Sequence, residues 1–162
     1  MVSSVRLDVA RLIASQRWAA IATIGDGVPH ASMVAYAPEP VPGGLLMLLS
    51  GLSAHTQHML DEPRVSLVIG APDSGEGDPQ QLPRVSLQGK VTEIPRDAEE
   101  FAVAATRYVR RFPNADMRLQ LADFRLFRFE IDEARYVGGF ARAFSLTGDD
   151  LHEAMAALPG EN

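Results

Sequence analysis

The feature that most constrains the fold is a very short link between two strand-like segments near the start of the chain. Residues 18–24 read Trp-Ala-Ala-Ile-Ala-Thr-Ile, which is typical of a buried strand, and residues 30–37 form a second such segment. Between them, Gly25-Asp26-Gly27 is a turn signal. Parallel strands need a crossover of about a dozen residues or more, so these two segments must pair as an antiparallel hairpin. The link therefore disfavours a doubly wound α/β fold.

The rest of the chain adds short apolar segments separated by turns and polar loops. Their patterns predict strands at residues 45–49, 64–71, 84–94 and 126–131, with 134–137 continuing the sheet after a kink. Apolar spacing and capping residues predict helices at residues 3–16, 53–60 and 96–111, and a last helix from Thr147 or Asp149 to about residue 157. We expect a mainly β, α+β fold: an antiparallel split β-barrel of six to seven strands with peripheral helices, because closure removes exposed strand edges. Residues 1–162 have the usual size of a single domain.

Composition excludes several classes of function. The chain has no cysteine, which rules out a disulfide, a thiolate nucleophile and a cysteine-ligated metal. Its net charge of −6 disfavours a nucleic-acid partner, and its single lysine, Lys90, disfavours Schiff-base chemistry. No segment has the apolar length of a signal peptide or a membrane span, so we expect a cytoplasmic protein with no membrane partner.

The strongest local signal for a ligand lies at residues 50–56, which read Ser-Gly-Leu-Ser-Ala-His-Thr. This segment comes where an apolar strand meets the start of a predicted helix, and free backbone N–H groups at a helix start attract anions. Hydroxyl groups and His55 add donors, and Gly51 lets a ligand approach the backbone. The alternative is that Ser53 simply caps the helix.

Four stretches, in this order and spacing, resemble a known family. They are WAAIATIGDGVPHASMVAYAPEP, GGLLMLLSGLSAHTQHMLDEPRVSLVIG, GDPQQLPRVSLQGKV and ARYVGGFARAFSL. Together they resemble the pyridoxamine-5′-phosphate-oxidase-like FMN-binding split barrels, and in particular the haem-utilisation branch. The resemblance covers residues 5–150 and implies bound flavin mononucleotide (FMN) and a homodimer with the cofactor at its interface.

The resemblance also implies which residues bind the cofactor. The second strand would border the flavin ring and ribityl chain through Ser32, Met33, Val34 and Ala35. The end of the third strand and the next turn would hold the phosphate through Leu49, Ser50, His55 and Thr56. Across the dimer, the expected contacts are Arg84 and Gln88. The C-terminal segment lies near the site in this branch and adds Phe140 and Arg142 as weaker candidates.

The chain departs from the oxidase at its phosphate site. The oxidase has an arginine at the position of Ser32 and an Arg-Lys pair where this chain has His55 and Thr56. Charge-assisted hydrogen bonds are roughly twice as strong as neutral ones, so these changes should weaken phosphate binding. We expect Arg84 of the partner subunit to compensate, and we regard pyridoxamine phosphate as a doubtful substrate.

Three functions follow from the resemblance and the residues. The first is an FMN-dependent oxidoreductase with an unknown small-molecule substrate, in which the cofactor carries the chemistry and no catalytic residue is assigned. The second is a haem-binding or haem-degrading protein, whose candidate iron ligands are His30, His55, His58 and His152. The third is a non-catalytic flavin-binding dimer. In each case we expect a second subunit to cover the outer apolar face of residues 45–49.

Other patterns have a structural and a functional interpretation. His55 and His58 have a spacing that can hold a metal, but no third ligand is evident and we assign no metal site. No G-x-S-x-G motif or nucleophilic triad is present. Basic residues at 107, 110 and 111 suit a helix C-terminus, and the alternative is a haem-propionate or dimer contact. Trp18 is expected in the core, with flavin stacking as the alternative.

Overall fold

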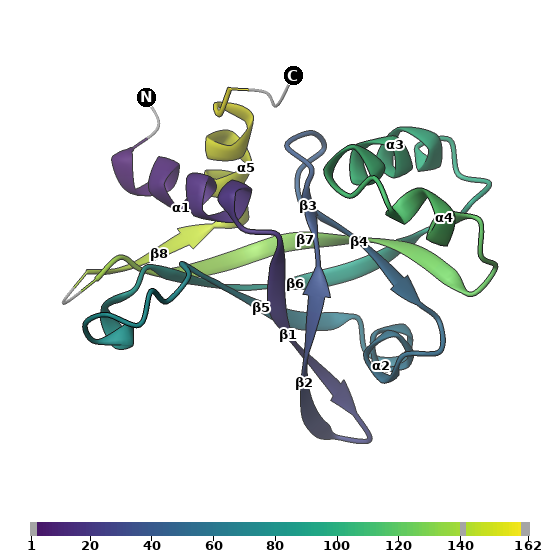
Figure 1. Cartoon of the computed structure of the whole chain (residues 1–162), viewed down its shortest axis with the longest axis horizontal. Coiled ribbons are helices and arrows are strands. Elements are labelled where there is room, and N and C mark those ends of the chain that lie inside the picture. The colour runs from purple at the N-terminus through teal and green to yellow at the C-terminus, as the bar shows by residue number, and fades with distance from the viewer. Residues whose placement is uncertain (1–2, 140–141, 160–162) are drawn as a thin grey trace.

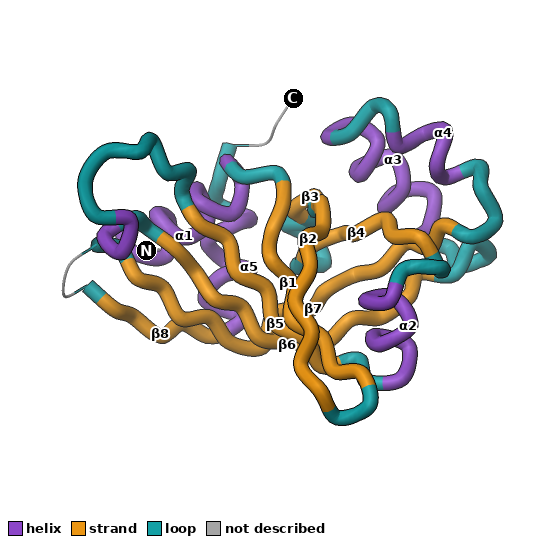
Figure 2. The backbone as a smooth tube through the Cα atoms, turned by 60° about the horizontal axis from the view of Figure 1, so that its bottom comes forward, coloured by secondary structure: helices purple, strands orange, loops and turns teal. Residues whose placement is uncertain are grey.

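A curled antiparallel sheet forms the centre of the computed structural model, which describes residues 3–139 and 142–159 (Figures 1 and 2). Its strand order is β2-β1-β5-β6-β7-β4-β3, and β8 pairs with β7. The strands are β1 (Trp18–Gly25), β2 (Val28–Ala35), β3 (Ala37–Pro38), β4 (Leu45–Ser50), β5 (Arg64–Gly70), β6 (Arg84–Ile94), β7 (Phe124–Val137) and β8 (Ala143–Thr147). The helices are α1 (Ser4–Ser15), α2 (Ala54–Asp61), α3 (Phe101–Arg111), α4 (Ala115–Leu119) and α5 (Gly148–Ala156). The predicted fold class, an antiparallel mainly β split barrel with peripheral helices, is confirmed.

The first hairpin forms as the sequence predicts. Trp18 pairs with Ala35 at the open end and Gly25 pairs with Val28 at the closed end. The loop is only Asp26 and Gly27, whose φ angles are 53° and 74°. Positive φ at both central residues is the requirement of a type I′ turn, which matches the natural twist of paired strands and favours Asp-Gly.

Strand β4 is apolar on both faces because it separates two cores. Leu45, Met47 and Leu49 face the main core inside the curled sheet, where they meet residues of α1 and α5. Leu46 and Leu48 face a second core under α3 and α4. Helices of the same chain therefore cover the outer face of this strand, and the expectation that a second subunit covers it is wrong.

Strand β7 is longer than the sequence indicates, because a bulge lets it continue through the predicted kink. Gln88 of β6 pairs with Glu133, whereas Gly89 pairs with Ile131, so Asp132 is the extra residue. A Cβ atom at Gly89 would lie 1.9 Å from the Glu130 carbonyl oxygen, so only glycine allows this close approach. The bulge bends the strand and lets its second half pair with β8.

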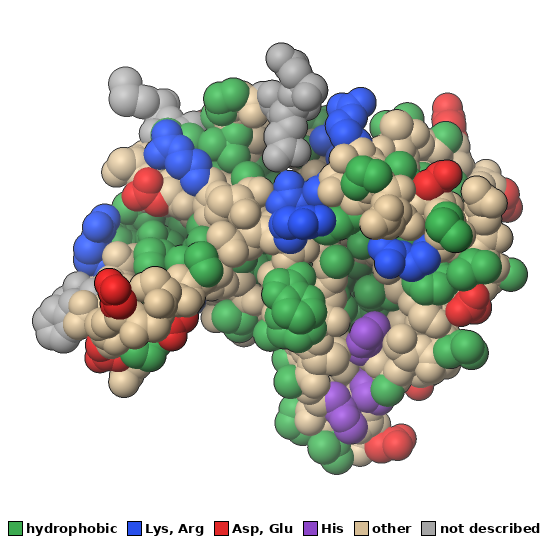
Figure 3. Space-filling model, viewed as in Figure 1, with side chains coloured by type: hydrophobic (Ala, Val, Ile, Leu, Met, Phe, Trp, Pro, Cys, Tyr) green, Lys and Arg blue, Asp and Glu red, His purple; other side chains and the backbone are tan. Residues whose placement is uncertain are grey.

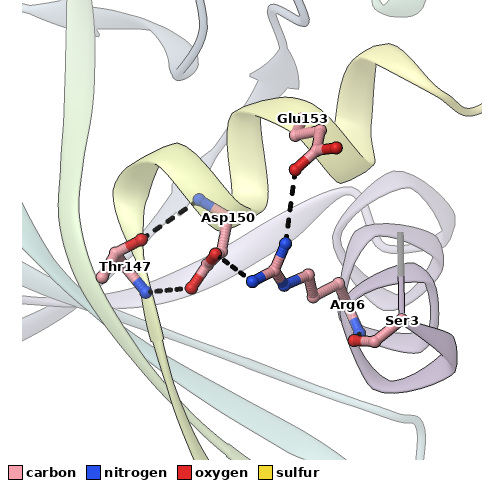
Figure 4. Close-up of polar contacts among 5 residues, drawn as sticks. All are labelled: Ser3, Arg6, Thr147, Asp150 and Glu153. Carbon is pink, nitrogen blue, oxygen red and sulfur yellow. Dashed lines mark hydrogen bonds and ion pairs between the residues drawn. The ribbon is translucent and has the colours of Figure 1, made fainter. Parts of the chain in front are cut away.

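Helices α1 and α5 lie together at one end of the sheet (Figure 1). Arg6 of α1 contacts Asp150 at 2.5 Å and Glu153 at 3.3 Å, and both carboxylates belong to α5 (Figure 4). Thr147 accepts a hydrogen bond from the Asp150 backbone while Asp150 accepts one from the Thr147 backbone, which is a complete capping box. Of the two capping residues considered, Thr147 is the one used.

The remaining differences concern short elements. Helix α3 begins at Phe101, because residues 95–100 form turns ahead of it. Helix α4 and strand β8 are short segments that the sequence did not indicate. Among the described residues, no helix has both the length and the apolar character to cross a bilayer.

Candidate functional site

The candidate site lies where β4 ends, α2 begins and the β1–β2 hairpin passes close by. Ser53 occupies the N-cap position of α2, but its hydroxyl makes no capping hydrogen bond. Within the described part of the chain, no acceptor meets the backbone N–H groups of Ala54 and His55. Two open N–H groups and a free hydroxyl at the positive end of a helix form a favourable position for an anion.

Ser50 is engaged by its own neighbourhood. Its Oγ accepts a hydrogen bond from the Leu52 backbone at 3.2 Å and donates one to Asp123 Oδ2 at 3.1 Å. Asp123 thus places a carboxylate beside the predicted phosphate ligand. This contact opposes anion binding at Ser50 unless the Asp123 side chain moves away.

Arg125 is a second neighbour of this turn. A Cβ atom on Gly51 would lie 2.9 Å from the Asp123 carbonyl oxygen and 3.5 Å from Arg125 Nε. Arg125 also forms a 3.3 Å ion pair with Glu93. The sequence analysis missed Asp123 and Arg125 because both reach the turn through the pairing of β7 with β4, about 70 positions along the chain.

Histidine side chains gather at this end of the molecule (Figure 3). His55 Nδ1 lies 3.0 Å from Ser32 Oγ, and His58 Nδ1 lies 3.0 Å from Thr23 Oγ1. The His30 and His58 rings are in contact, with centroids 4.5 Å apart. We call His30, His55 and His58 the histidine cluster.

The electrostatics of the cluster favour neutral imidazole at His55. Burial lowers the pKa of His55 below its usual 6.5, and the neighbouring His58 lowers it further. A neutral imidazole is a weaker anion ligand than a cation but is the form that binds a metal. Among the described residues, no group of three or more His, Asp or Glu side chains is arranged to hold a metal ion.

The residues predicted to border the flavin ring divide between the two faces of β2. Ser32 lies on the face toward α2, where it meets His55. Val34, which shares that face, is buried in the core. Met33 and Ala35 point to the opposite, outer face, because side chains alternate along a strand. Leu49 is also buried in the core, so its side chain is not presented to a ligand.

Thr56 lies in the first turn of α2 and is completely buried. Its Oγ1 is closed to solvent and has no hydrogen-bond partner. An unsatisfied buried hydroxyl is unusual in a folded protein. As the structure stands, a ligand at the surface reaches His55 but not Thr56.

The second half of the predicted site lies at the other end of the sheet. Arg84 pairs with Gly70 and Val137 at the start of β6. Arg64, which begins β5 shortly after α2, pairs with Lys90 towards the opposite end of β6. Arg84 Nη1 donates to the carbonyl oxygens of Gln80 and Leu82, so its guanidinium is held by its own loop. Within one chain, the structure does not bring Arg84 to the phosphate turn.

The last three predicted contacts are also distant from α2 or lie outside the described region. Gln88 lies exposed on the outer face of β6, beside Glu133. Arg142 is exposed at the turn between β7 and β8, near the Arg84 end of the sheet. Phe140 lies outside the described residues.

Comparison with known proteins identifies the family. Residues 6–153 match the family described as CREG, beta-barrel. The chain belongs to the CREG β-barrel family. The predicted relation to pyridoxamine-phosphate-oxidase-like split barrels is confirmed by this match, and the fold is shared with a pyridoxinephosphate-oxidase-family protein from Clostridium acetobutylicum (TM-score 0.67, 11% identity, covering 90% of this chain and 96% of that chain).

The relatives of this family member include haem proteins. The chain is 29% identical over 123 residues to the haem oxygenase HutZ of Vibrio cholerae, covering 73% of this chain and 68% of HutZ. It is 29% identical over 134 residues to the chloroplastic non-canonical haem oxygenase HOZ of Arabidopsis thaliana, covering 82% of this chain and 39% of HOZ. A haem-binding protein from Mycobacterium smegmatis superposes with a TM-score of 0.84 at 27% identity, over 94% of this chain and 62% of that chain. The chain thus spans well under half of HOZ and somewhat under two thirds of the mycobacterial protein.

Trp18, expected in the core, is instead 61% exposed, and that expectation is wrong. It begins β1 on the outer face of the sheet, where Ala20 pairs with Met33 on one side and Val68 on the other. Four apolar side chains on this face are between 40% and 61% exposed, and we call them the outer strip: Trp18, Ile24, Met33 and Val68.

Proposed function

We propose that this protein binds haem and that His55 is the ligand to the iron. The observation that supports this proposal most strongly is the hydrogen bond between Ser32 Oγ and Nδ1 of His55. A histidine that ligates a metal usually donates its other ring nitrogen to a neighbour, which fixes the ring and its tautomer. With Nδ1–H donating to Ser32, Nε2 presents its lone pair, and no described residue is hydrogen-bonded to it.

The surroundings of His55 suit an apolar, planar group with an iron centre. Its lowered pKa keeps the imidazole neutral near pH 7, as iron ligation requires. Leu52, one turn earlier in the chain, is 85% exposed and offers apolar contact for a macrocycle. When bound, haem supplies the iron and its redox chemistry, and the chain supplies the ligand and the surface.

Similarity supports the same proposal. The two curated relatives are named haem oxygenases, and the mycobacterial structure is named a haem-binding protein. His58 is a poorer candidate ligand, because its Nε2 packs against Gly25, where an added Cβ would lie 2.3 Å away. His152 is separate from the cluster and lies against Gly43.

A second candidate function is flavin binding at the same helix start. The open N–H groups of Ala54 and His55 and the free Ser53 hydroxyl fit the phosphate of FMN. Against it, His55 is neutral and the Asp123 carboxylate lies beside Ser50. Arg125 of the same chain is a cation that lies beside the turn. An oxidoreductase role for FMN stays a prediction, as does the cytoplasmic location.

We also propose that the protein is a homodimer in which the outer strip meets the partner. The strip is apolar and uncovered, and burial of apolar surface is the main driving force of association. A dimer would also allow Arg84 and Arg142 of one chain to approach the α2 end of the other, which one chain alone does not achieve.

Two titrations distinguish the candidate functions. Haem and FMN are each added to the wild type, His55→Ala and Ser53→Ala, and binding is followed by absorbance. The haem proposal predicts a Soret band for the wild type and for Ser53→Ala, and its loss in His55→Ala. If FMN binds instead, with affinity lowered in Ser53→Ala, and haem produces no Soret shift, flavin binding replaces haem binding. Addition of ascorbate to the haem complex then tests whether the haem is degraded.

A further inference from the structure

A cavity far from the histidine cluster carries a second inference. It has a volume of about 280 Å³ and lies between α1, α3, β3 and α5. In Figure 1 these helices lie above the sheet, whereas α2 and the hairpin tip lie at the lower edge. Apolar side chains form much of its wall, among them Ala14, Ala37, Met155 and Leu158. We call this cavity the Arg107 pocket.

Arginine side chains from one helix form the other side of the pocket. Arg107, Arg110 and Arg111 all line it, and no aspartate or glutamate is among the described lining residues. Arg111 has a structural role, because its Nη2 donates to the carbonyl oxygens of Ala14 and Gln16 at the end of α1. Arg110 lies in the last turn of α3, where the helix dipole favours a cation.

Neither the structural hydrogen bonds described for Arg111 nor the dipole of the last helical turn accounts for Arg107. It lies one turn before the end of α3 and is half-buried. No carboxylate of the described residues forms an ion pair with it, although the chain carries a net charge of −6. A partly desolvated guanidinium without an anion is unfavourable, so its surroundings are best completed by an anionic group.

We propose that the Arg107 pocket binds a small organic carboxylate with an apolar body. The guanidinium fork of Arg107 matches a carboxylate, and the apolar wall matches the rest of such a molecule. The volume of about 280 Å³ lies just below the range typical of ligand sites, about 300–1,000 Å³, which limits the ligand to a short chain or a single ring. The proposal does not depend on haem binding, because the pocket shares no residue with the histidine cluster.

Isothermal titration with three probes tests this assignment. The first is 4-phenylbutyrate, which has the charge and the apolar body; the second is 4-phenylbutanol, which has the body alone; the third is sulfate, which has the charge alone. We expect saturable binding of 4-phenylbutyrate to the full chain and at least tenfold weaker binding of the other two. If sulfate binds as tightly as 4-phenylbutyrate, the pocket is a simple anion patch and the proposal is overturned.

Two variants and a control locate the bound molecule. Arg107→Gln should weaken 4-phenylbutyrate binding about tenfold, because the variant loses the charge-assisted hydrogen bonds of the guanidinium. Ala14→Leu keeps every charge but fills the cavity, and it should weaken binding to a similar degree. Arg118→Gln removes a charge from exposed α4, outside the pocket, and should leave binding unchanged. With all three variants folded by circular dichroism, unchanged binding in both Arg107→Gln and Ala14→Leu would overturn the proposal.

Discussion

His55 shows how single neighbours set the chemistry of one residue. Ser32 fixes the orientation of its ring through Nδ1. Burial and the nearby His58 lower the pKa of His55, which favours the neutral imidazole. A phosphate would be bound better by a cationic histidine. The same side chain that the sequence assigns to an anion is therefore better suited, in its folded surroundings, to a metal-bearing ligand.

The lowered pKa of His55 gives a pH dependence of stability. The unfolded chain takes up a proton near pH 6.5, whereas the folded chain does so only at lower pH. Below pH 6.5 the unfolded state therefore binds more protons, and the free energy of unfolding decreases until the folded pKa is passed. Urea unfolding at pH 7.5, 6.5 and 5.5 should show a smaller decrease for His55→Asn than for the wild type. Parallel decreases for the two proteins would contradict this.

The buried ion pair between Glu39 and Arg128 should contribute more to the free energy of unfolding. Glu39 is 3% exposed, and its carboxylate accepts two hydrogen bonds from Arg128, at 2.5 and 3.0 Å. Glu39→Gln removes the hydrogen-bonded counter-charge of Arg128 and leaves the more exposed Glu100, 3.8 Å away, as a weaker partner, which should lower the free energy of unfolding by up to about 3 kcal/mol. Urea unfolding measures this. The exposed pair Glu62–Arg64 is the matched control, and Glu62→Gln should have a much smaller effect; equal losses would show that burial is not the cause.

At the scale of elements, the position of helix α5 is fixed by its own N-terminal cap and by ion pairs with α1. Its capping box is formed by Thr147 and Asp150, and its outer carboxylates bind Arg6 of α1 (Figure 4). Hydrogen bonds from Thr147, together with the charge of Arg6, lower the pKa of Asp150. Because Met155 and Leu158 line the Arg107 pocket, the position of α5 also shapes that cavity.

Removing the cap should therefore weaken the molecule measurably. Thr147→Ala removes the hydroxyl that accepts from the Asp150 backbone, and loss of such a cap costs about 1 kcal/mol. Thr147→Ser keeps the hydroxyl and should stay close to the wild type. Chemical denaturation compares the three proteins. If Thr147→Ser is destabilised as much as Thr147→Ala, the methyl group and not the cap is responsible.

Most elements could be predicted from the sequence because they depend on local patterns. Turn residues and alternating apolar positions predict the hairpin and most of the strands. Trp18 was misplaced because its neighbours are small and apolar, and only the pairing of β1 shows which face it occupies. The division of the predicted site between Arg84 at one end and His55 at the other could not be predicted, because it depends on long-range strand register.

At the scale of the whole molecule, the outer strip is an exposed apolar surface among the described residues, and it leads to a prediction about assembly. If the outer strip is the dimer interface, Trp18→Glu places a charge in it and should convert a dimer into a monomer of 17.6 kDa. Analytical ultracentrifugation measures the mass. Val103→Glu places the same charge on the outside of α3, where Val103 is 67% exposed, and should leave the dimer intact. A wild type that sediments as a monomer would contradict the proposed dimer.

Haem binding through the histidine cluster is tested most directly by an absorbance titration of the full chain with haem. His55→Ala is compared with His152→Ala, since His152 lies outside the cluster. We predict a Soret band in the wild type that His152→Ala retains and His55→Ala loses. A Soret band of equal position and intensity in all three proteins, or none in the wild type, would contradict the assignment of His55 as the iron ligand.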